Sequence, residues 1–268
     1  MRLLKIRNVS KTYGAGADRY VALDGIDLDI ASGEFLCLLG PSGCGKSTLL
    51  NIMAGFEVAN TGTVMFNGAP VVRPGRDRMM FFQDAGSALL PWLTVEENVR
   101  FGLRVRKVPK QNWDEIIDRY LRMVDLDRHR RKMPTQLSGG MRQRLQIARA
   151  LAVEPAVLLM DEPFAALDAL TKRRMHGVLL DIWQRTGKTV VFVTHDIGEA
   201  ISLGDRIAMM SVGPGSNITK IITLDMPRPR DFTNPAAARL FNEIEAELSP
   251  EILRSERRAA GAVECGGV

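Results

Sequence analysis

Cysteine, long apolar runs and secretion signals are scarce or absent in this 268-residue chain, and each absence excludes a class of protein. The three cysteines, Cys37, Cys44 and Cys265, share no metal-ligand spacing, which fits a reducing compartment. No apolar run reaches the roughly 18 residues of a membrane-spanning helix, since even residues 156–160 are followed directly by two acidic residues. The N-terminus lacks the apolar core of a secretion signal. We therefore expect a chain that is soluble by itself in the cytoplasm.

Internal repeats and low-complexity segments are also missing, so one large domain, with or without a smaller lobe, accounts for the length. A hydrophobic fraction of 46% is sufficient for a substantial core. The formal charge of +5 is spread along the chain without interleaved aromatic residues, and its densest clusters, residues 128–132 and 254–258, are typical of solvated faces or tails. We predict no nucleic-acid binding and favour phosphate and the membrane surface as anionic partners.

The spacing of apolar residues predicts an α/β fold. Residues 35–39 are apolar throughout, as in a strand buried on both faces, and strand-helix alternation after residue 157 predicts a parallel sheet. A helix is expected at residues 47–54, with Gly55 as its stop. Strands are expected at residues 3–9, 26–30, 35–39, 61–66, 79–82, 157–160, 189–193, 207–210 and 218–224.

The apolar period becomes helical between residue 94 and about residue 152, where one helix face carries Ile116, Ile117, Tyr120, Leu121 and Val124. This predicts a helical lobe. Near the end of the chain, the Pro-Arg-Pro-Arg stretch at residues 227–230 resists regular structure. A closing amphipathic helix is expected around residues 240–248.

Residues 40–48 match the pattern Gly-x-x-x-x-Gly-Lys-Ser/Thr of a phosphate-binding loop, and they lie between a predicted strand and a predicted helix. Glycines let backbone N–H groups converge on phosphate oxygens, and the helix N-terminus adds partial positive charge. Lys46 is expected to reach the β- and γ-phosphates and Ser47 to ligate Mg²⁺. The alternative, an ordinary Gly-rich turn, fits this context poorly. The predicted nucleotide-binding residues of the loop are Gly40, Pro41, Ser42, Gly43, Cys44, Gly45, Lys46, Ser47 and Thr48.

Two adjacent carboxylates, Asp161 and Glu162, end the apolar strand at residues 157–160. A buried strand of an α/β sheet delivers its carboxyl end to a ligand crevice. We expect Asp161 to hold Mg²⁺ through water and Glu162 to polarise the attacking water as general base. The alternative is that these acids only cap the next helix.

A second anion site is indicated at Ser138, which is a good helix N-cap, because Gly139 and Gly140 leave the first-turn N–H groups open. The alternative is a simple cap with a flexible entry. Leu-Ser-Gly-Gly at residues 137–140 resembles the signature Leu-Ser-Gly-Gly-Gln of the ATP-binding cassette (ABC) family.

That resemblance covers nearly the whole chain, from Val9 to about Met210. It implies a P-loop NTPase fold, the ABC-type nucleotide-binding domain, with an antiparallel β-subdomain and an inserted helical subdomain. In the family, the signature binds the γ-phosphate of ATP held by the phosphate loop of the opposite subunit. A second copy of this chain is therefore an implied partner, and ATP and Mg²⁺ are the implied cofactors of an ATP hydrolase.

Four further positions match the family in order. Tyr13 matches the aromatic residue that stacks on adenine, although a core tyrosine is the alternative. Gln83 matches the glutamine that contacts Mg²⁺ and water and links the core to the helical lobe. Asp168 lies in a segment similar to the loop that crosses the dimer interface. His195 matches the switch histidine that contacts the γ-phosphate and, with Glu162 and Gln83, completes the implied catalytic set.

Three positions depart from the family pattern. Met141 replaces the glutamine of the signature, which removes a polar contact there. Ala166 stands where serine is common, and Gly198 stands where an acid is common. Gly198 is expected to loosen the following helix by up to about 1 kcal/mol.

Residues 89–99, which begin Leu-Leu-Pro-Trp, and residues 194–200 resemble ATPase subunits of nitrate/sulfonate/taurine-type importers. This implies an ATPase that energises uptake of a small oxyanion or a vitamin precursor through transmembrane permease subunits, with a solute-binding protein as an indirect partner. Its place would be peripheral, on the cytoplasmic face of the inner membrane. The expected domains are a cassette at residues 1–226, with its helical subdomain at about 86–156, and a linker and helical tail at residues 227–268.

Two alternatives remain open. One is an export or lipoprotein-release ATPase with another permease, against which the Leu-Leu-Pro-Trp segment argues. The other is a soluble cassette factor, which would usually carry two cassettes or a long coiled coil, whereas this chain has one cassette and no sustained heptads.

In the transport reading, ATP closes two copies head to tail, and grooves near residues 83–95 transmit the motion to the permease. The segment at residues 84–88 looks longer than usual in the family.

Overall fold

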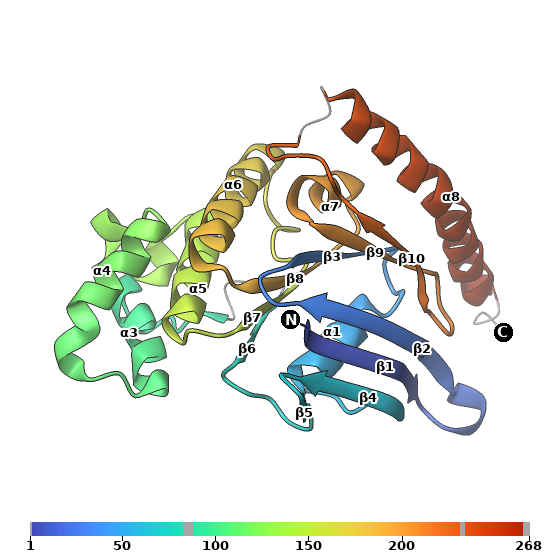
Figure 1. Cartoon of the computed structure of the whole chain (residues 1–268), viewed down its shortest axis with the longest axis horizontal. Coiled ribbons are helices and arrows are strands. Elements are labelled where there is room, and N and C mark those ends of the chain that lie inside the picture. Colours follow the sequence, from blue (N-terminus) through green and yellow to red (C-terminus); the bar gives the residue numbers. More distant parts are fainter. Residues whose placement is uncertain (1, 83–87, 231–233, 265–268) are drawn as a thin grey trace. The chain divides into compact units, whose positions relative to one another are not determined.

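The computed structural model describes the backbone of residues 2–82, 88–230 and 234–264, and side chains up to residue 249 apart from that of residue 17. The chain divides into two compact units, Met1–Pro74 with Val191–Val268, and Gly75–Val190. Figure 1 labels their helices and strands. The expected boundaries at residues 86, 156 and 226 stay predictions.

An antiparallel sheet with the strand order β2-β1-β4-β5 occupies the N-terminal part of the first unit. Ile6 pairs with Leu28 on one side and with Val64 on the other. Alternate residues of the long strands face the core, as the pleat of a strand requires, and Leu4 and Ile6 are fully buried. The strands are β1 (Arg2–Tyr13), β2 (Tyr20–Ala31), β4 (Thr61–Phe66) and β5 (Ala69–Pro70), and a short 3₁₀ helix spans Gly16–Asp18.

A second group of strands in this unit has the order β10-β9-β3-β8, and the unit boundary falls within β8. β3 pairs in parallel with β9, and β9 pairs antiparallel with β10. All five residues of β3 are buried, as expected from its apolar run. The rings of Phe35 and Phe192 pack 6.1 Å apart between β3 and β8. The strands are β3 (Phe35–Leu39), β8 (Thr189–Thr194), β9 (Arg206–Met210) and β10 (Ile218–Thr223).

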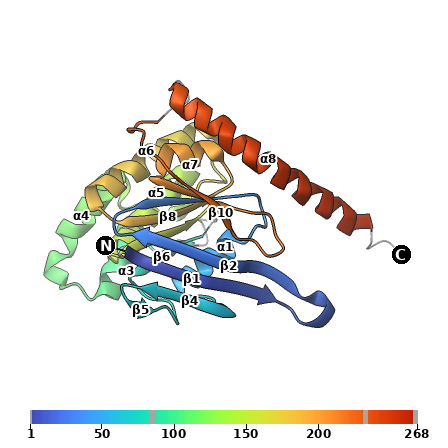
Figure 2. The same cartoon turned by 45° about the vertical axis from the view of Figure 1, so that its right-hand side comes forward.

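Helix α1 (Lys46–Ala54) follows β3 and ends at Gly55, as the sequence predicts. Gly55 has φ +84°, and its N–H bonds to the carbonyls of the last turn. A Cβ there would lie 2.4 Å from the Arg73 carbonyl oxygen, so glycine is required by both conformation and space. Of the unit's later helices, α7 (Ile197–Leu203) packs beside α8 (Pro235–Glu264), and the two lie next to each other in Figure 2.

The second unit contains a parallel pair of strands, β6 (Arg78–Phe81) and β7 (Val157–Asp161), and the expected helical lobe. Helices α3 and α5 approach so closely that a Cβ at Gly102 would lie 2.8 Å from the Ala152 Cβ. Thr94 and Glu97 form a capping box at the start of α3. The helices are α3 (Val95–Arg106), α4 (Trp113–Met123), α5 (Gly139–Ala152) and α6 (Ala169–Thr186), and 3₁₀ helices span Lys110–Asn112, Asp127–His129 and Pro134–Gln136.

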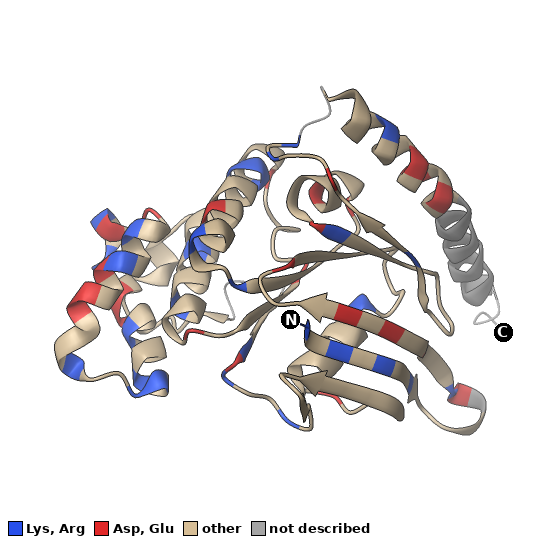
Figure 3. Ribbon diagram, viewed as in Figure 1, with Lys and Arg blue, Asp and Glu red and all other residues tan. Residues whose placement is uncertain are grey.

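None of the helices, over the residues described, is long and apolar enough to cross a membrane. In both α3 and α4 the acidic residues come first along the helix and the basic residues follow, so each helix carries both signs of charge (Figure 3). Of the five residues predicted to share one helix face, Ile116 is half-buried and the other four, Ile117, Tyr120, Leu121 and Val124, are buried. The amphipathic pattern therefore identified the packed side of the lobe.

Candidate nucleotide-binding and hydrolysis site

The predicted phosphate-binding loop connects β3 to α1 in the first unit. Gly45 is the N-cap of α1 with φ +88°, and no side chain caps this helix. A Cβ at Gly45 would lie 2.8 Å from Leu23 Cδ2 and 3.0 Å from the Ala22 carbonyl oxygen, whereas open space surrounds Gly43, which has φ +77°. These left-handed glycines turn the loop around a helix N-terminus, which is the geometry of an anion-binding site.

Lys46 is held inside this loop. Its Nζ donates to the carbonyl oxygens of Gly40 and Pro41, both at 2.7 Å, and the residue is only 5% exposed. A Cβ at Gly40 would lie 2.8 Å from Cys44 Sγ, so the loop is tightly packed. Burial raises the pKa of the Cys44 thiol, although the nearby Lys46 charge acts in the opposite direction. The loop therefore carries a preorganised ammonium group and a protonated thiol at neutral pH.

Tyr13, the predicted adenine-stacking residue, ends β1 and is 38% exposed, so it is not the core tyrosine of the alternative reading. Its hydroxyl donates to the Glu57 carboxylate at 2.5 Å and lies 3.4 Å from Thr48 Oγ1. Partial burial raises the pKa of Tyr13, and the hydrogen bond to Glu57 adds to the rise. The ring is thus anchored at its hydroxyl end beside the phosphate-binding loop, with the Lys11 ammonium 5.1 Å from its centre.

Tyr20 is a loop contact that sequence reasoning missed. It pairs with Tyr13 across β1 and β2, and its hydroxyl donates to the Gly43 carbonyl oxygen at 3.3 Å. A Cβ at Gly213 would lie 2.8 Å from that hydroxyl, so the small residue leaves room for it. No sequence pattern marks Tyr20, because strand pairing alone brings it to the loop.

His195 lies exposed on the turn between β8 and α7. Thr194 Oγ1 donates to the Glu199 carboxylate at 2.5 Å and accepts the N–H of Asp196 at 3.0 Å. Asp196 caps α7 by accepting the N–H of Glu199 at 3.1 Å. Hydrogen bonds on both sides therefore fix the backbone that carries His195.

In the second unit, β7 ends at Asp161, and Glu162 follows with φ +42°. A non-glycine residue in the left-handed region costs about 1–2 kcal/mol and is concentrated at functional sites. The buried amide of Gln143, on α5, donates to the Pro163 carbonyl oxygen and braces this turn. The alternative reading, in which the acids cap the next helix, is wrong, because Asp168 is the N-cap of α6.

Asp168 accepts the backbone N–H of Thr171 at 2.9 Å, and this hydrogen bond lowers the pKa of its carboxyl group. Ser138 is the N-cap of α5, as predicted, and accepts the N–H of Met141 at 3.4 Å. A Cβ at Gly140 would lie 2.8 Å from Thr171 Cγ2, so the signature glycine packs against the start of α6. The second unit therefore brings the signature next to the Asp168 segment.

The predicted site residues are thus divided between the two units. Tyr13, the loop at residues 40–48 and His195 belong to the first, and the signature, the two carboxylates and Asp168 belong to the second. Gln83 lies outside the described residues, as do residues 84–87 of the segment that looks long for the family. His129 and His176 have no predicted role in the site. The ring of His176 packs 5.6 Å from the ring of Phe164.

A family model described as ABC transporter matches residues 23–165. The chain belongs to the ABC transporter family. The cassette is 44% identical to the ABC transporter ATP-binding protein MJ0412 of Methanocaldococcus jannaschii, over 94% of this chain and 93% of that protein. It is 48% identical to the bicarbonate transport ATP-binding protein CmpD of Synechococcus elongatus, over 85% of this chain and 82% of that protein. It is 42% identical to the nitrate import ATP-binding protein NrtD of the same organism, over 83% of this chain and 81% of that protein.

Solved structures agree with this assignment. The dimeric post-hydrolysis state of the cassette MJ0796 bound to ADP and Pi matches with a TM-score of 0.71 and 34% identity, over 84% of this chain and 100% of that one. The structure of cbiO1 from Clostridium perfringens, part of the transporter complex cbiONQ, matches with a TM-score of 0.77 and 26% identity, over 93% and 96%. The predicted fold, an α/β ABC-type nucleotide-binding domain of an ATP-hydrolysing enzyme, is confirmed.

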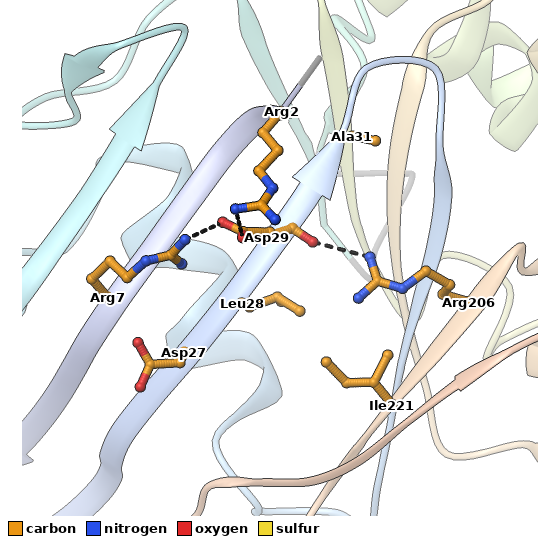
Figure 4. A pocket seen from close by; sticks show the side chains of 8 residues that line it. All are labelled: Arg2, Arg7, Asp27, Leu28, Asp29, Ala31, Arg206 and Ile221. Atoms are coloured by element: carbon orange, nitrogen blue, oxygen red, sulfur yellow. Dashed lines mark hydrogen bonds and ion pairs between the residues drawn. The ribbon is translucent and has the colours of Figure 1, made fainter.

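The cassette has another pocket in its first unit, of about 570 Å³, which does not resemble a phosphate site (Figure 4). Asp29 pairs with Arg2 at 2.5 Å and with Arg7 at 2.6 Å. Arg206 donates to the Asp29 carbonyl oxygen and pairs with Glu34 at 2.9 Å. Protein oxygens already engage all three cations of this pocket, so we assign no ligand to it.

Proposed function

We propose that this cassette is the ATP-hydrolysing subunit of an ABC importer that takes up a small oxyanion or vitamin precursor through a partner permease. The observation that carries the proposal is the presence of two glycine-bearing helix starts in one chain, at Lys46 of α1 and at Ser138 of α5. In the family, the two helix starts that meet one nucleotide come from two copies, and the dimeric state of the cassette MJ0796 bound to ADP and Pi supports two copies here. The names of the bicarbonate and nitrate relatives support import.

In this proposal, the loop at residues 40–48 binds the phosphates of ATP. The buried Lys46 ammonium, held by two loop carbonyls, would reach a γ-phosphate oxygen. Tyr13 offers its exposed ring to adenine. Ser138, Gly139 and Gly140 of the other copy would close the site from the opposite side.

Mg²⁺, when bound, would neutralise charge on the phosphate oxygens. Its proposed protein ligands are Ser47, Gln83 and Asp161. The described part of the chain has no cluster of three or more His, Cys, Asp or Glu residues that could hold a metal. The proposed ligands Ser47, Gln83 and Asp161 fit Mg²⁺, because this ion usually keeps several waters and binds through few protein oxygens plus substrate phosphates.

Glu162 is the proposed general base. Its left-handed backbone, braced through Pro163 by Gln143, fixes the direction in which the carboxylate leaves the end of β7. A half-buried carboxylate at a fixed position can accept a proton from an attacking water. His195, on its own hydrogen-bonded turn, would contact the γ-phosphate, and Gln83 is the third proposed catalytic residue.

A pocket of about 180 Å³ between β6, α3 and α5 of the second unit is the proposed docking site of the permease. Met80 and Phe81 line it from β6, and Phe101 and Val105 line it from α3 while remaining 40% and 42% exposed. Exposed apolar side chains around a pocket are typical of protein interaction sites. Docking on a helix of the permease would place the cassette at the cytoplasmic face of the inner membrane. A solute-binding protein would be an indirect partner. That the cassette does not bind nucleic acid also stays a prediction.

The proposal is tested with the complex co-purified in mild detergent and reconstituted into vesicles. We expect the purified complex to contain a permease, and Glu162→Gln to bind ATP while losing both ATPase activity and solute uptake. Full steady-state ATPase activity of Glu162→Gln would overturn the general-base assignment. Movement of substrate out of the cytoplasmic side would overturn import in favour of export.

A further inference from the structure

The guanidinium of Arg230 is buried, with only 7% of the residue exposed, although it lies in a segment that the sequence identifies only as irregular. Its Nε donates to the Met226 carbonyl oxygen at 2.8 Å, and Nη2 donates to that of Leu224 at 2.9 Å. Nη1 donates to the carbonyl oxygens of Ile201, at 3.1 Å, and Gly204. Four main-chain carbonyl oxygens thus compensate the buried positive charge of Arg230. Burial lowers the pKa of this guanidinium.

Arg228 makes a parallel attachment two residues earlier. Its Nη2 donates to the Leu203 carbonyl oxygen at 2.5 Å, and Nη1 pairs with the Asp205 carboxylate at 2.9 Å. The other oxygen of Asp205 accepts the N–H of Phe35, at the start of β3, at 2.9 Å. Arg228 therefore ties the end of α7 to the first residue of the central strand β3.

The acceptors Ile201, Leu203 and Gly204 are the last carbonyls of α7 and its C-cap. A helix end leaves such carbonyls without partners inside the helix, and a cation there also complements the helix dipole. α7 has only seven residues, a length at which a helix has little stability of its own. Its orientation therefore depends on tertiary contacts: its buried face packs against β3 and α8, and Arg228 and Arg230 hold its C-terminal end.

His195 lies at the opposite end, immediately before the Asp196 cap of α7. The network of Thr194, Asp196 and Glu199 joins the histidine turn to the helix. A seven-residue helix is about 10 Å long and moves as one short body. Release of its C-terminal end would shift the turn that carries His195.

We infer that Arg230, assisted by Arg228, is a positioning residue for ATP hydrolysis: it holds the C-terminal end of α7 and thereby sets the position of His195. The inference rests on the proposed role of His195 at the γ-phosphate. The planar guanidinium suits this task because its donors are fixed in direction and reach several carbonyls at once, which a lysine ammonium does not reproduce. The segment at residues 226–230, between β10 and α8, is then part of the hydrolytic apparatus and not only a linker.

The test uses the full-length protein, in complex with its permease where that is needed for turnover. Arg230→Met and Arg230→Lys are compared with Arg7→Met, which removes an arginine from an exposed ion pair of the same unit. We expect Arg230→Met to lower kcat about tenfold while KM for ATP and equilibrium ATP binding stay within about twofold. Arg230→Lys should recover part of the loss, and Arg7→Met should match wild type. Hydrogen exchange should rise in α7 of Arg230→Met while α1 keeps its protection.

A double-mutant comparison separates positioning from general destabilisation. In a His195→Ala background, Arg230→Met should lower the remaining kcat no further, because the group that it positions is gone. An equal additional loss in that background, or an unchanged kcat in folded Arg230→Met, would overturn the inference. If Arg230→Met does not fold, Arg228→Gln carries the same comparison. Full activity of His195→Ala would instead refute the proposed role of His195, which is a separate outcome.

Discussion

The hydroxyl of Tyr13 donates a hydrogen bond to the Glu57 carboxylate at 2.5 Å, which anchors the end of β1 to the segment that follows α1. The half-exposed ring is therefore held by its hydroxyl end, and the Lys11 ammonium lies over one of its faces, 5.1 Å from the ring centre. We expect Tyr13→Ala to weaken ATP binding about tenfold, since stacking on a base contributes about 1–3 kcal/mol. Tyr13→Phe keeps the face and should lose at most about threefold. Titration with a fluorescent ATP analogue measures both, and equal losses in the two variants would contradict the stacking role.

Lys46 is the next test, because its ammonium lies between two loop carbonyls and beside the proposed phosphate position. Lys46→Ala should lower kcat/KM for ATP by at least about a hundredfold, the usual effect of removing a charged group from a transition state. Steady-state phosphate release gives the value. Circular dichroism controls for folding, and wild-type turnover in a folded variant would be incompatible with a phosphate-binding role.

The proposed site, formed by the phosphate loop of one copy and the signature of another, predicts complementation between two inactive proteins. Lys46→Ala disables a phosphate loop, and Ser138→Arg disables a signature, so neither homodimer retains an intact site. In an equal mixture, half of the dimers contain one of each and regain one site, which should return up to roughly a quarter of wild-type ATPase activity. The activity of the mixture is compared with that of each protein alone. If no activity returns although mixed dimers form, the two halves of a site do not come from different copies.

The proposed permease-docking pocket between β6, α3 and α5 is tested at Phe101, an exposed apolar residue of its lining. Phe101→Glu should weaken co-purification with the permease, because it removes an apolar side chain from the pocket and puts there a charge that docking would have to desolvate. Val72→Glu, at a residue 70% exposed in the other unit, is the matched control and should leave co-purification unchanged. Pull-down through a tag on the permease provides the measurement. Retention of Phe101→Glu at wild-type levels would exclude this pocket as the docking site of the permease.

Alkaline pH should destabilise the fold through Cys37. Its thiol is fully buried, and burial, with the nearby Glu199 charge, raises its pKa strongly. The folded state therefore keeps a thiol proton that the unfolded state loses above about pH 8.5. The contribution of Cys37 to the free energy of unfolding is thus fully present below that pH and declines above it, by up to about 1.4 kcal/mol per pH unit. Urea unfolding at several pH values should show a flatter alkaline decline for Cys37→Ala, each protein being referred to its own value at pH 7. Parallel curves would rule out this thiol as the source.

Local patterns were sufficient for much of the fold and for one half of the site. The strand-loop-helix at residues 35–54 was predictable because an apolar strand, obligatory glycines and a helix stop follow one another along the chain. Ser138 could be recognised as a helix cap for the same reason, since a cap acts within one turn. Gln83 received its role only from family resemblance, and that role stays a prediction.

Contacts between distant segments could not be predicted in this way. Tyr20 meets Gly43 because of strand register, and Gln143 meets Pro163 because α5 packs next to the end of β7. Nothing in the local sequence of either pair indicates the other member. The Asp168 cap of α6 is different, because its contact with Thr171 is local, but the sequence pattern did not fix the residue at which that helix begins.

By itself, the sequence determined that this protein binds a nucleotide, since the phosphate loop needs only neighbouring residues in the correct order. Only the tertiary structure decided that Arg228 and Arg230, in a segment that reads as an irregular linker, hold the end of the helix that follows His195. Their carbonyl acceptors lie more than twenty residues away in the chain, apart from two near Arg230. A buried guanidinium is stable only where folding brings such acceptors together, and that arrangement has no signature in a linear sequence.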